Sequence, residues 1–143
     1  MSFKEALELY FERSNSMQTY WNFYVTMALA LLAFFATSKA GKQLRMVAFV
    51  LTVGFAAFAV VNYAALRNVT EERLATAAII KTGPVNNVPP PQYADIIRKT
   101  IRPPSVVGVT VLHAVSDVVV LAAIWILATR REGRHYSVSG SGS

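Results

Sequence analysis

The stretch Val106–Thr129, VVGVTVLHAVSDVVVLAAIWILAT, decides the fold. An apolar run of about 20 residues is long enough to cross the hydrocarbon layer of a membrane as a helix. His113 and Asp117 lie four residues apart, and therefore on one face of that helix, with Ser116 beside Asp117. At a rise of about 1.5 Å per residue, Asp117 lies roughly 16 Å in from Val106, near the middle of a layer about 30 Å thick. Because a carboxylate there costs at least ~2.5 kcal/mol, we expect Asp117 to face protein or water and not lipid.

The composition indicates a single membrane domain, which we assign to residues 1–136. Of 143 residues, 54% are hydrophobic and only 15% are charged, which is too apolar for a soluble domain. The net charge of +6 comes from basic residues that flank apolar runs, where membrane orientation and anionic headgroups account for them. We therefore expect no nucleic-acid partner. Residues 137–143, SVSGSGS, resemble a linker or tag remnant.

Two further apolar runs predict two more spans. The first extends from about Tyr20 to Ala36 and opens with aromatic residues of the kind found at headgroup level. The second extends from about Leu44 to Leu66, so only a short connection separates the two spans. We predict that they form a close helical hairpin. Small residues recur along both spans, at Ala30 and Ala33 in the first and at Ala48 in the second, which favours close approach of helix backbones.

The remaining segments predict shorter helices outside the spans. Phe3, Leu7, Tyr10 and Phe11 fall on one helical face of an N-terminal amphipathic helix, which we expect to end at Ser14–Ser16. The long loop before the third span predicts two short helices, at about Thr70–Lys81 and Pro91–Ile101, separated by a proline-rich segment. The first of these helices is either separate or a direct continuation of the second span. The predicted fold class is thus an all-α integral membrane protein with three transmembrane helices, an N-terminal amphipathic helix and two short loop helices.

Depth along each predicted helix links polar residues of different spans. Counted at about 1.5 Å per residue from the long-loop face, six polar residues fall between that face and the middle of the membrane. These candidate site residues are Asn62, Thr26, His113, Thr52, Ser116 and Asp117. They are either hydrogen-bonding groups that hold the helices together or a polar track through the membrane, because ionisable groups inside membranes concentrate on ion and proton pathways.

The distribution of Lys and Arg indicates an orientation. The N-terminus and the long loop together contain more basic residues than the short connection and the tail. In the short connection and the tail, however, the basic residues lie closer to the ends of the spans. The bias toward positive charge inside is strongest near span ends. We therefore expect the C-terminus in the cytoplasm, the N-terminus and long loop outside, and insertion in the cytoplasmic (inner) membrane.

No catalytic motif accompanies the intramembrane polar residues. The chain has no cysteine, no Gly-rich phosphate loop and no HExxH or GxSxG motif, so we expect neither an enzyme nor a metal or cofactor. Three hypotheses for the function remain. The first is a homo-oligomeric pore for cations or protons, because three helices cannot enclose a channel alone. The second is an accessory or scaffold subunit that binds a partner membrane protein. The third is a ligand-sensing or transport module with its site at His113.

Overall fold

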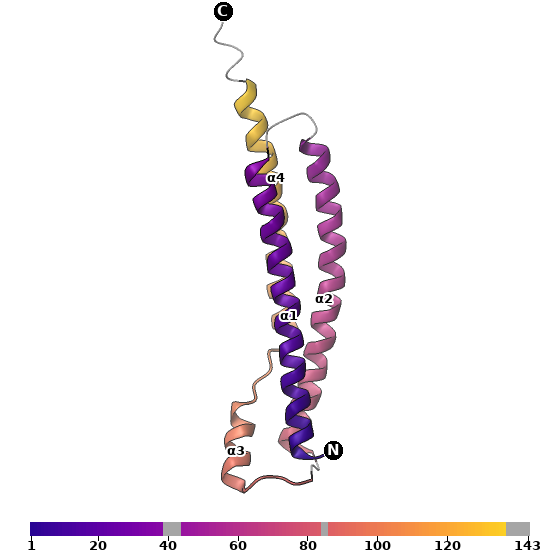
Figure 1. Cartoon of the computed structure of the whole chain (residues 1–143), viewed down its shortest axis with the longest axis vertical. Helices are drawn as coiled ribbons and strands as arrows, with labels where there is room; N and C mark the ends of the chain where they lie inside the picture. The colour runs from indigo at the N-terminus through magenta and orange to yellow at the C-terminus, as the bar shows by residue number, and fades with distance from the viewer. Residues whose placement is uncertain (39–43, 84–85, 137–143) are drawn as a thin grey trace, which may run out of the picture. The chain divides into compact units, whose positions relative to one another are not determined.

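The described part of the chain is helical. The structure is a computed structural model that describes residues 1–38, 44–83 and 86–136, with side chains as far as Thr129. In these residues it contains four helices, drawn in Figure 1: α1 (Phe3–Thr37), α2 (Leu44–Thr82), α3 (Pro91–Thr100) and α4 (Val106–Tyr136). The predicted connection at 39–43, Pro84 and the tail at 137–143 lie outside the described residues.

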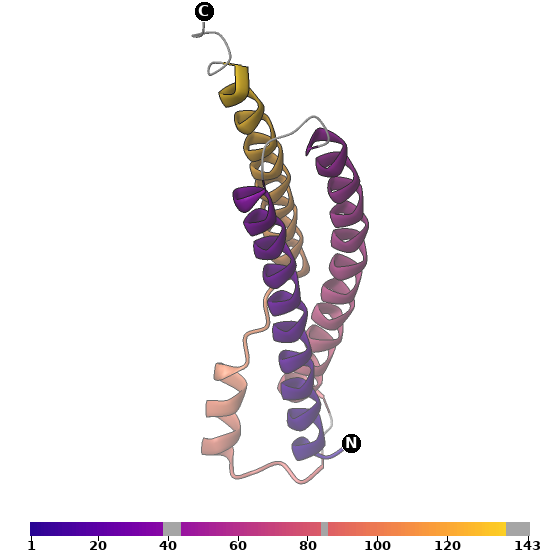
Figure 2. The same cartoon turned by 45° about the horizontal axis from the view of Figure 1, so that its top comes forward.

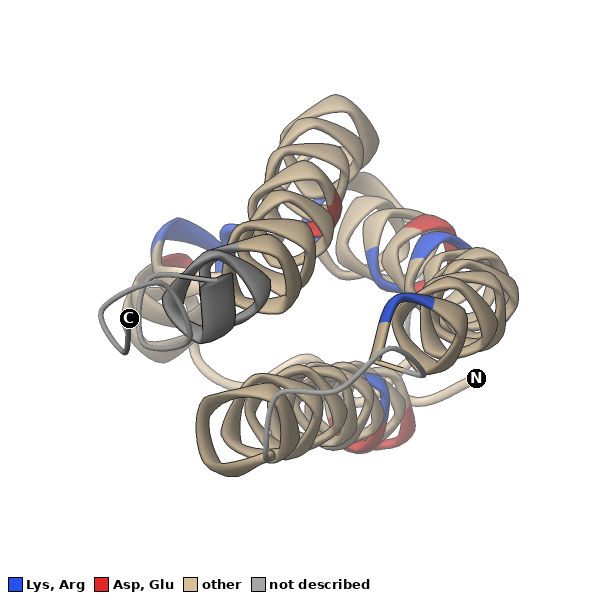
Figure 3. Cartoon of the chain, turned by 90° about the horizontal axis from the view of Figure 1, so that it is seen from above, with Lys and Arg blue, Asp and Glu red and all other residues tan. Residues whose placement is uncertain are grey.

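Three of these helices are long and apolar enough to cross a membrane. They are α1, α2 and the part of α4 from Val106 to Thr129. Uncharged residues make up most of each long ribbon in Figure 3. The predicted all-α class with three apolar spans is confirmed at this level, and it indicates an integral membrane protein with several spans.

The separate N-terminal amphipathic helix is not observed, because α1 runs without interruption from Phe3 to Thr37 (Figure 2). The sequence predicted a break at Ser14–Ser16. Instead, the Ser14 and Ser16 hydroxyls donate to the carbonyls of Tyr10 and Glu12, four residues back, at 2.8 and 3.1 Å. A serine that bonds to its own helix in this way does not cap a new one. The amphipathic segment is therefore the first part of α1.

Of the two short helices predicted in the long loop, the first is not separate but continues from the second span, the alternative that the sequence had left open. Residues 70–81 form the end of α2, because the Thr70 hydroxyl donates to the Leu66 carbonyl at 2.7 Å and the helix continues through it. The only separate helix described between α2 and α4 is α3, Pro91–Thr100. Pro91 suits the first helical position because its nitrogen needs no hydrogen-bond acceptor there.

Serine side chains mark the starts of α1 and α4. Ser2 and Glu5 form a reciprocal cap, in which the Ser2 backbone N–H donates to Glu5 Oε2 at 2.7 Å and the Glu5 N–H donates to Ser2 Oγ at 3.2 Å. At the start of α4, the Gly108 N–H donates to Ser105 Oγ at 3.0 Å. These bonds satisfy backbone donors that have no partner within the helix.

The chain divides into two compact units, and each long helix contributes to both. The first unit comprises Met1–Asn22 and Tyr63–Leu112, and the second comprises Phe23–Asn62 and His113–Ser143. The first unit holds two apolar clusters. One cluster contains Phe3, Ala6, Tyr10, Ala77, Ile80 and Ile101. The other contains Met17, Leu66, Val69 and Val109.

Candidate functional site

A chain of polar side chains joins three helices within the second unit. We call Tyr24, Asn62, His113 and Asp117 the polar chain. The Tyr24 hydroxyl of α1 donates to Asp117 Oδ1 at 2.7 Å, and Asp117 Oδ2 lies 2.8 Å from Nδ1 of His113, one helical turn earlier on α4. Nε2 of His113 lies 3.5 Å from the amide nitrogen of Asn62 on α2. Both carboxylate oxygens and both imidazole nitrogens therefore have a polar neighbour.

Aromatic rings shield this chain from its surroundings. The His113 side chain is 2% exposed, and its ring centroid lies 4.8 Å from that of Tyr24. The Tyr24 ring in turn contacts Phe55 and Phe58, at centroid distances of 5.9 and 6.4 Å. In such apolar surroundings the hydrogen bonds are stronger and an unpaired polar atom would be costly. Asp117 is less enclosed, because its side chain is 24% exposed.

The contacts of His113 accommodate two protonation states. With an ionised Asp117, the neutral imidazole donates from Nδ1 to Asp117 and its bare Nε2 accepts from the Asn62 amide. When Nε2 gains a proton, it needs an acceptor. A turn of the Asn62 amide presents the side-chain oxygen in place of the nitrogen. The site can therefore take up a proton without leaving a buried donor unpaired.

The six residues selected from the sequence fall into two groups. Asp117, His113 and Asn62 are brought together in the polar chain. Ser116 is half-buried, Thr26 is exposed, and the Thr52 hydroxyl is shielded from solvent without a hydrogen-bond partner. The first group forms a continuous set of contacts.

Tyr24 is the member of the polar chain that the sequence did not reveal. Its place within the aromatic run Tyr20–Tyr24 led to its assignment to the headgroup belt. In the structure the residue is buried, with 3% of its surface exposed. One signal in the sequence could have identified it. Tyr24 lies two residues before Thr26, so the two residues lie at similar depth, and Thr26 was already a candidate for polar contacts with the third span.

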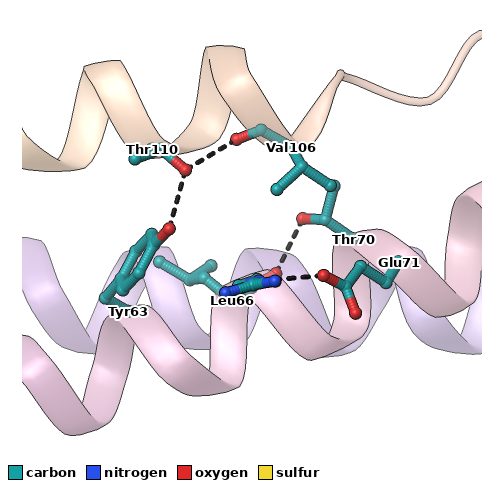
Figure 4. A network of polar contacts seen from close by, with 7 residues as sticks. Tyr63, Leu66, Thr70, Glu71, Val106 and Thr110 are labelled. Carbon is teal, nitrogen blue, oxygen red and sulfur yellow. Dashed lines mark hydrogen bonds and ion pairs between the residues drawn. The ribbon is translucent and has the colours of Figure 1, made fainter.

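A second polar contact between helices lies in the first unit, and Figure 4 shows it at close range. The hydroxyls of Tyr63 on α2 and Thr110 on α4 lie 2.8 Å apart, and the Thr110 hydroxyl also lies 2.9 Å from the Val106 carbonyl. On the same stretch of α2, Arg67 pairs with Glu71 at 2.8 Å. Both groups of this contact are hydroxyls, and a bond of this kind holds neighbouring helices together.

No group of three or more His, Asp or Glu residues in the described ranges is arranged to hold a metal ion. The polar chain therefore remains the candidate site on the strength of its geometry. No protein-family model, curated protein or solved structure matches this chain.

We predict that Tyr24→Phe lowers the free energy of unfolding by about 1 kcal/mol, because it removes a hydrogen bond to a carboxylate without removing the ring. The measurement is reversible unfolding in mixed micelles. Tyr20→Phe is the matched control, since Tyr20 lies on the same helix and packs against an apolar cluster. Equal losses in the two variants would mean that the bond to Asp117 contributes nothing specific.

Proposed function

We propose that the chain is the subunit of a homo-oligomeric membrane protein that passes protons or other small cations, with the His113–Asp117 pair as the site that binds them. The observation that carries the proposal is the buried imidazole with a carboxylate on one nitrogen and an amide on the other. Both charge states of this imidazole find hydrogen-bond partners, so the group is suited to bind and release a proton. Ionisable residues at this depth are characteristic of ion and proton pathways.

The exposure of Asp117 supports an assembly of several copies. About a quarter of its side chain remains exposed, at 24%, near the expected middle of the third span. A carboxylate facing acyl chains is costly, so water or another protomer must cover that surface. Water that reaches Asp117 would supply the path along which a cation or proton arrives.

The surface of α1 offers a face for such contacts. Ala30, Ala33 and Thr37 recur along the helix and are all exposed within one protomer. Small residues at this spacing let two helices approach closely in a membrane, where dispersion contacts drive association. Closed symmetric assemblies are the common form of homo-oligomers, and they would surround a path that three helices cannot enclose.

We predict that Asp117→Asn leaves assembly largely intact but reduces proton flux at least about tenfold, because the amide keeps the size of the carboxylate without its charge. The measurement is the internal pH of liposomes that contain the full chain and a pH-sensitive dye, together with the oligomer mass in mild detergent. Asp95→Asn, the same change at an exposed position on α3, should retain the flux.

Two results would contradict the pore. One is a wild-type chain that is a stable monomer and conducts neither protons nor alkali cations. The other is an Asp117→Asn variant with unchanged conductance and selectivity.

The accessory-subunit alternative has its own supporting observation. Val88, Tyr93 and Ile96 are exposed large apolar residues of the segment between α2 and α4, outside the expected spans. Such residues outside the membrane favour a protein partner. A monomeric chain without conductance would favour this role over the pore.

We further propose that the N-terminus and the segment between α2 and α4 lie on the non-cytoplasmic side of the cytoplasmic membrane. The C-terminus lies in the cytoplasm. The support is the distribution of Lys and Arg. In the short connection and in the tail, these residues are concentrated close to the ends of the spans.

A single cysteine tests this orientation, because the chain has none of its own. In intact cells, Asn86→Cys should react with a membrane-impermeant maleimide, since Asn86 is exposed. Thr37→Cys, at the C-terminal end of α1, should react only after the membrane is permeabilised. The reverse pattern would invert the proposed orientation.

A further inference from the structure

Arg73 is a half-buried cation that forms no ion pair with an acid among the residues whose side chains the structure describes. Its Nη1 donates to Met17 Sδ at 2.9 Å and its Nη2 donates to the Tyr10 hydroxyl at 3.2 Å. Its Cζ also lies 5.1 Å from the centroid of the Tyr10 ring. Nε is shielded from solvent and donates no hydrogen bond. The adjacent acid, Glu72, pairs at 2.8 Å with Arg13.

These contacts position the guanidinium but do not neutralise it. A thioether and a phenol are weak or neutral acceptors, and an aromatic ring offers only a modest attraction to a cation. Each Nη carries a second N–H, and the planar fork of arginine matches the paired oxygens of a phosphate or carboxylate. A partly desolvated positive charge without a counterion is unfavourable, and an oxygen anion would neutralise it.

The depth of Arg73 indicates which anion is available. Met17 lies three residues before Tyr20, where the first span is expected to begin, and therefore about 5 Å outside it. Arg73 lies seven residues beyond Leu66, about 10 Å outside the second span. Helical side chains point back toward the helix N-terminus, which for α2 is the direction of the apolar segment. The guanidinium therefore reaches the layer of lipid headgroups.

We propose that Arg73, held by Tyr10 and Met17, binds the phosphate of an anionic phospholipid headgroup. The guanidinium recognises a pair of phosphate oxygens, and dissolved phosphate also has such a pair. The headgroup is the source that the depth of the site favours. This lipid site is separate from the polar chain and independent of any proton flux.

The test measures lipid retention by the full chain in mild detergent, by native mass spectrometry, with phosphatidylglycerol and phosphatidylcholine as competing probes. Phosphatidylcholine carries the same phosphate beside a cationic choline, which competes with Arg73 for it. We therefore expect the wild-type protein to retain phosphatidylglycerol preferentially and Arg73→Gln to reduce that preference about tenfold. Arg67→Gln is the matched control, because it removes the same charge from an exposed arginine of α2 that pairs with Glu71. It should retain the preference.

Three results would overturn the proposal: no preference in the wild-type protein, an equal reduction in both variants, or displacement of the lipid by millimolar inorganic phosphate. The last would assign the site to dissolved phosphate. If Arg73→Gln does not fold, Arg73→Lys replaces it. Lysine keeps the charge but lacks the fork, so the preference should weaken, and an undiminished preference would contradict the site.

Discussion

The carboxylate of Asp117 constrains the packing of the second unit. An acid in an apolar helix requires partners for both of its oxygens, because the bilayer interior supplies none. One partner, His113, lies on the same helix, and the other is Tyr24 of α1. The imidazole is buried in turn and has Asn62 of α2 beside it. The contacts of this carboxylate and of the imidazole beside it thus bring together one face of each of three helices.

The long helices run without breaks because their serine and threonine side chains bond within their own helix. Serine and threonine residues that would cap helices in water donate their hydroxyls to carbonyls of the preceding turn, as Ser14 and Thr70 do. Each such bond satisfies the hydroxyl inside its own helix and leaves the backbone ladder intact. The chain can therefore carry polar side chains along α1 and α2 without interrupting either helix.

The sequence contains enough information for the spans and for three of the four members of the polar chain. Long apolar runs predict the three long helices, and the spacing of four residues predicts that His113 and Asp117 share a face. Helix ends were harder to predict, because a serine caps one helix or bonds within another according to contacts that are not local. Depth along a helix follows from counting residues, and it led to Asn62. The rotation of α1 about its axis depends on tertiary packing, so counting could not show that Tyr24 faces inward.

The tautomer of His113 tests the central claim most directly. Nitrogen NMR of the chain in lipid bilayers, with ¹⁵N-labelled histidine and a His135→Gln variant to leave one signal, distinguishes the two ring nitrogens. In the neutral imidazole, the contacts with Asp117 and Asn62 require a protonated Nδ1 and a bare Nε2. A neutral imidazole protonated at Nε2, or an Nδ1 without a proton beside Asp117, would contradict the account.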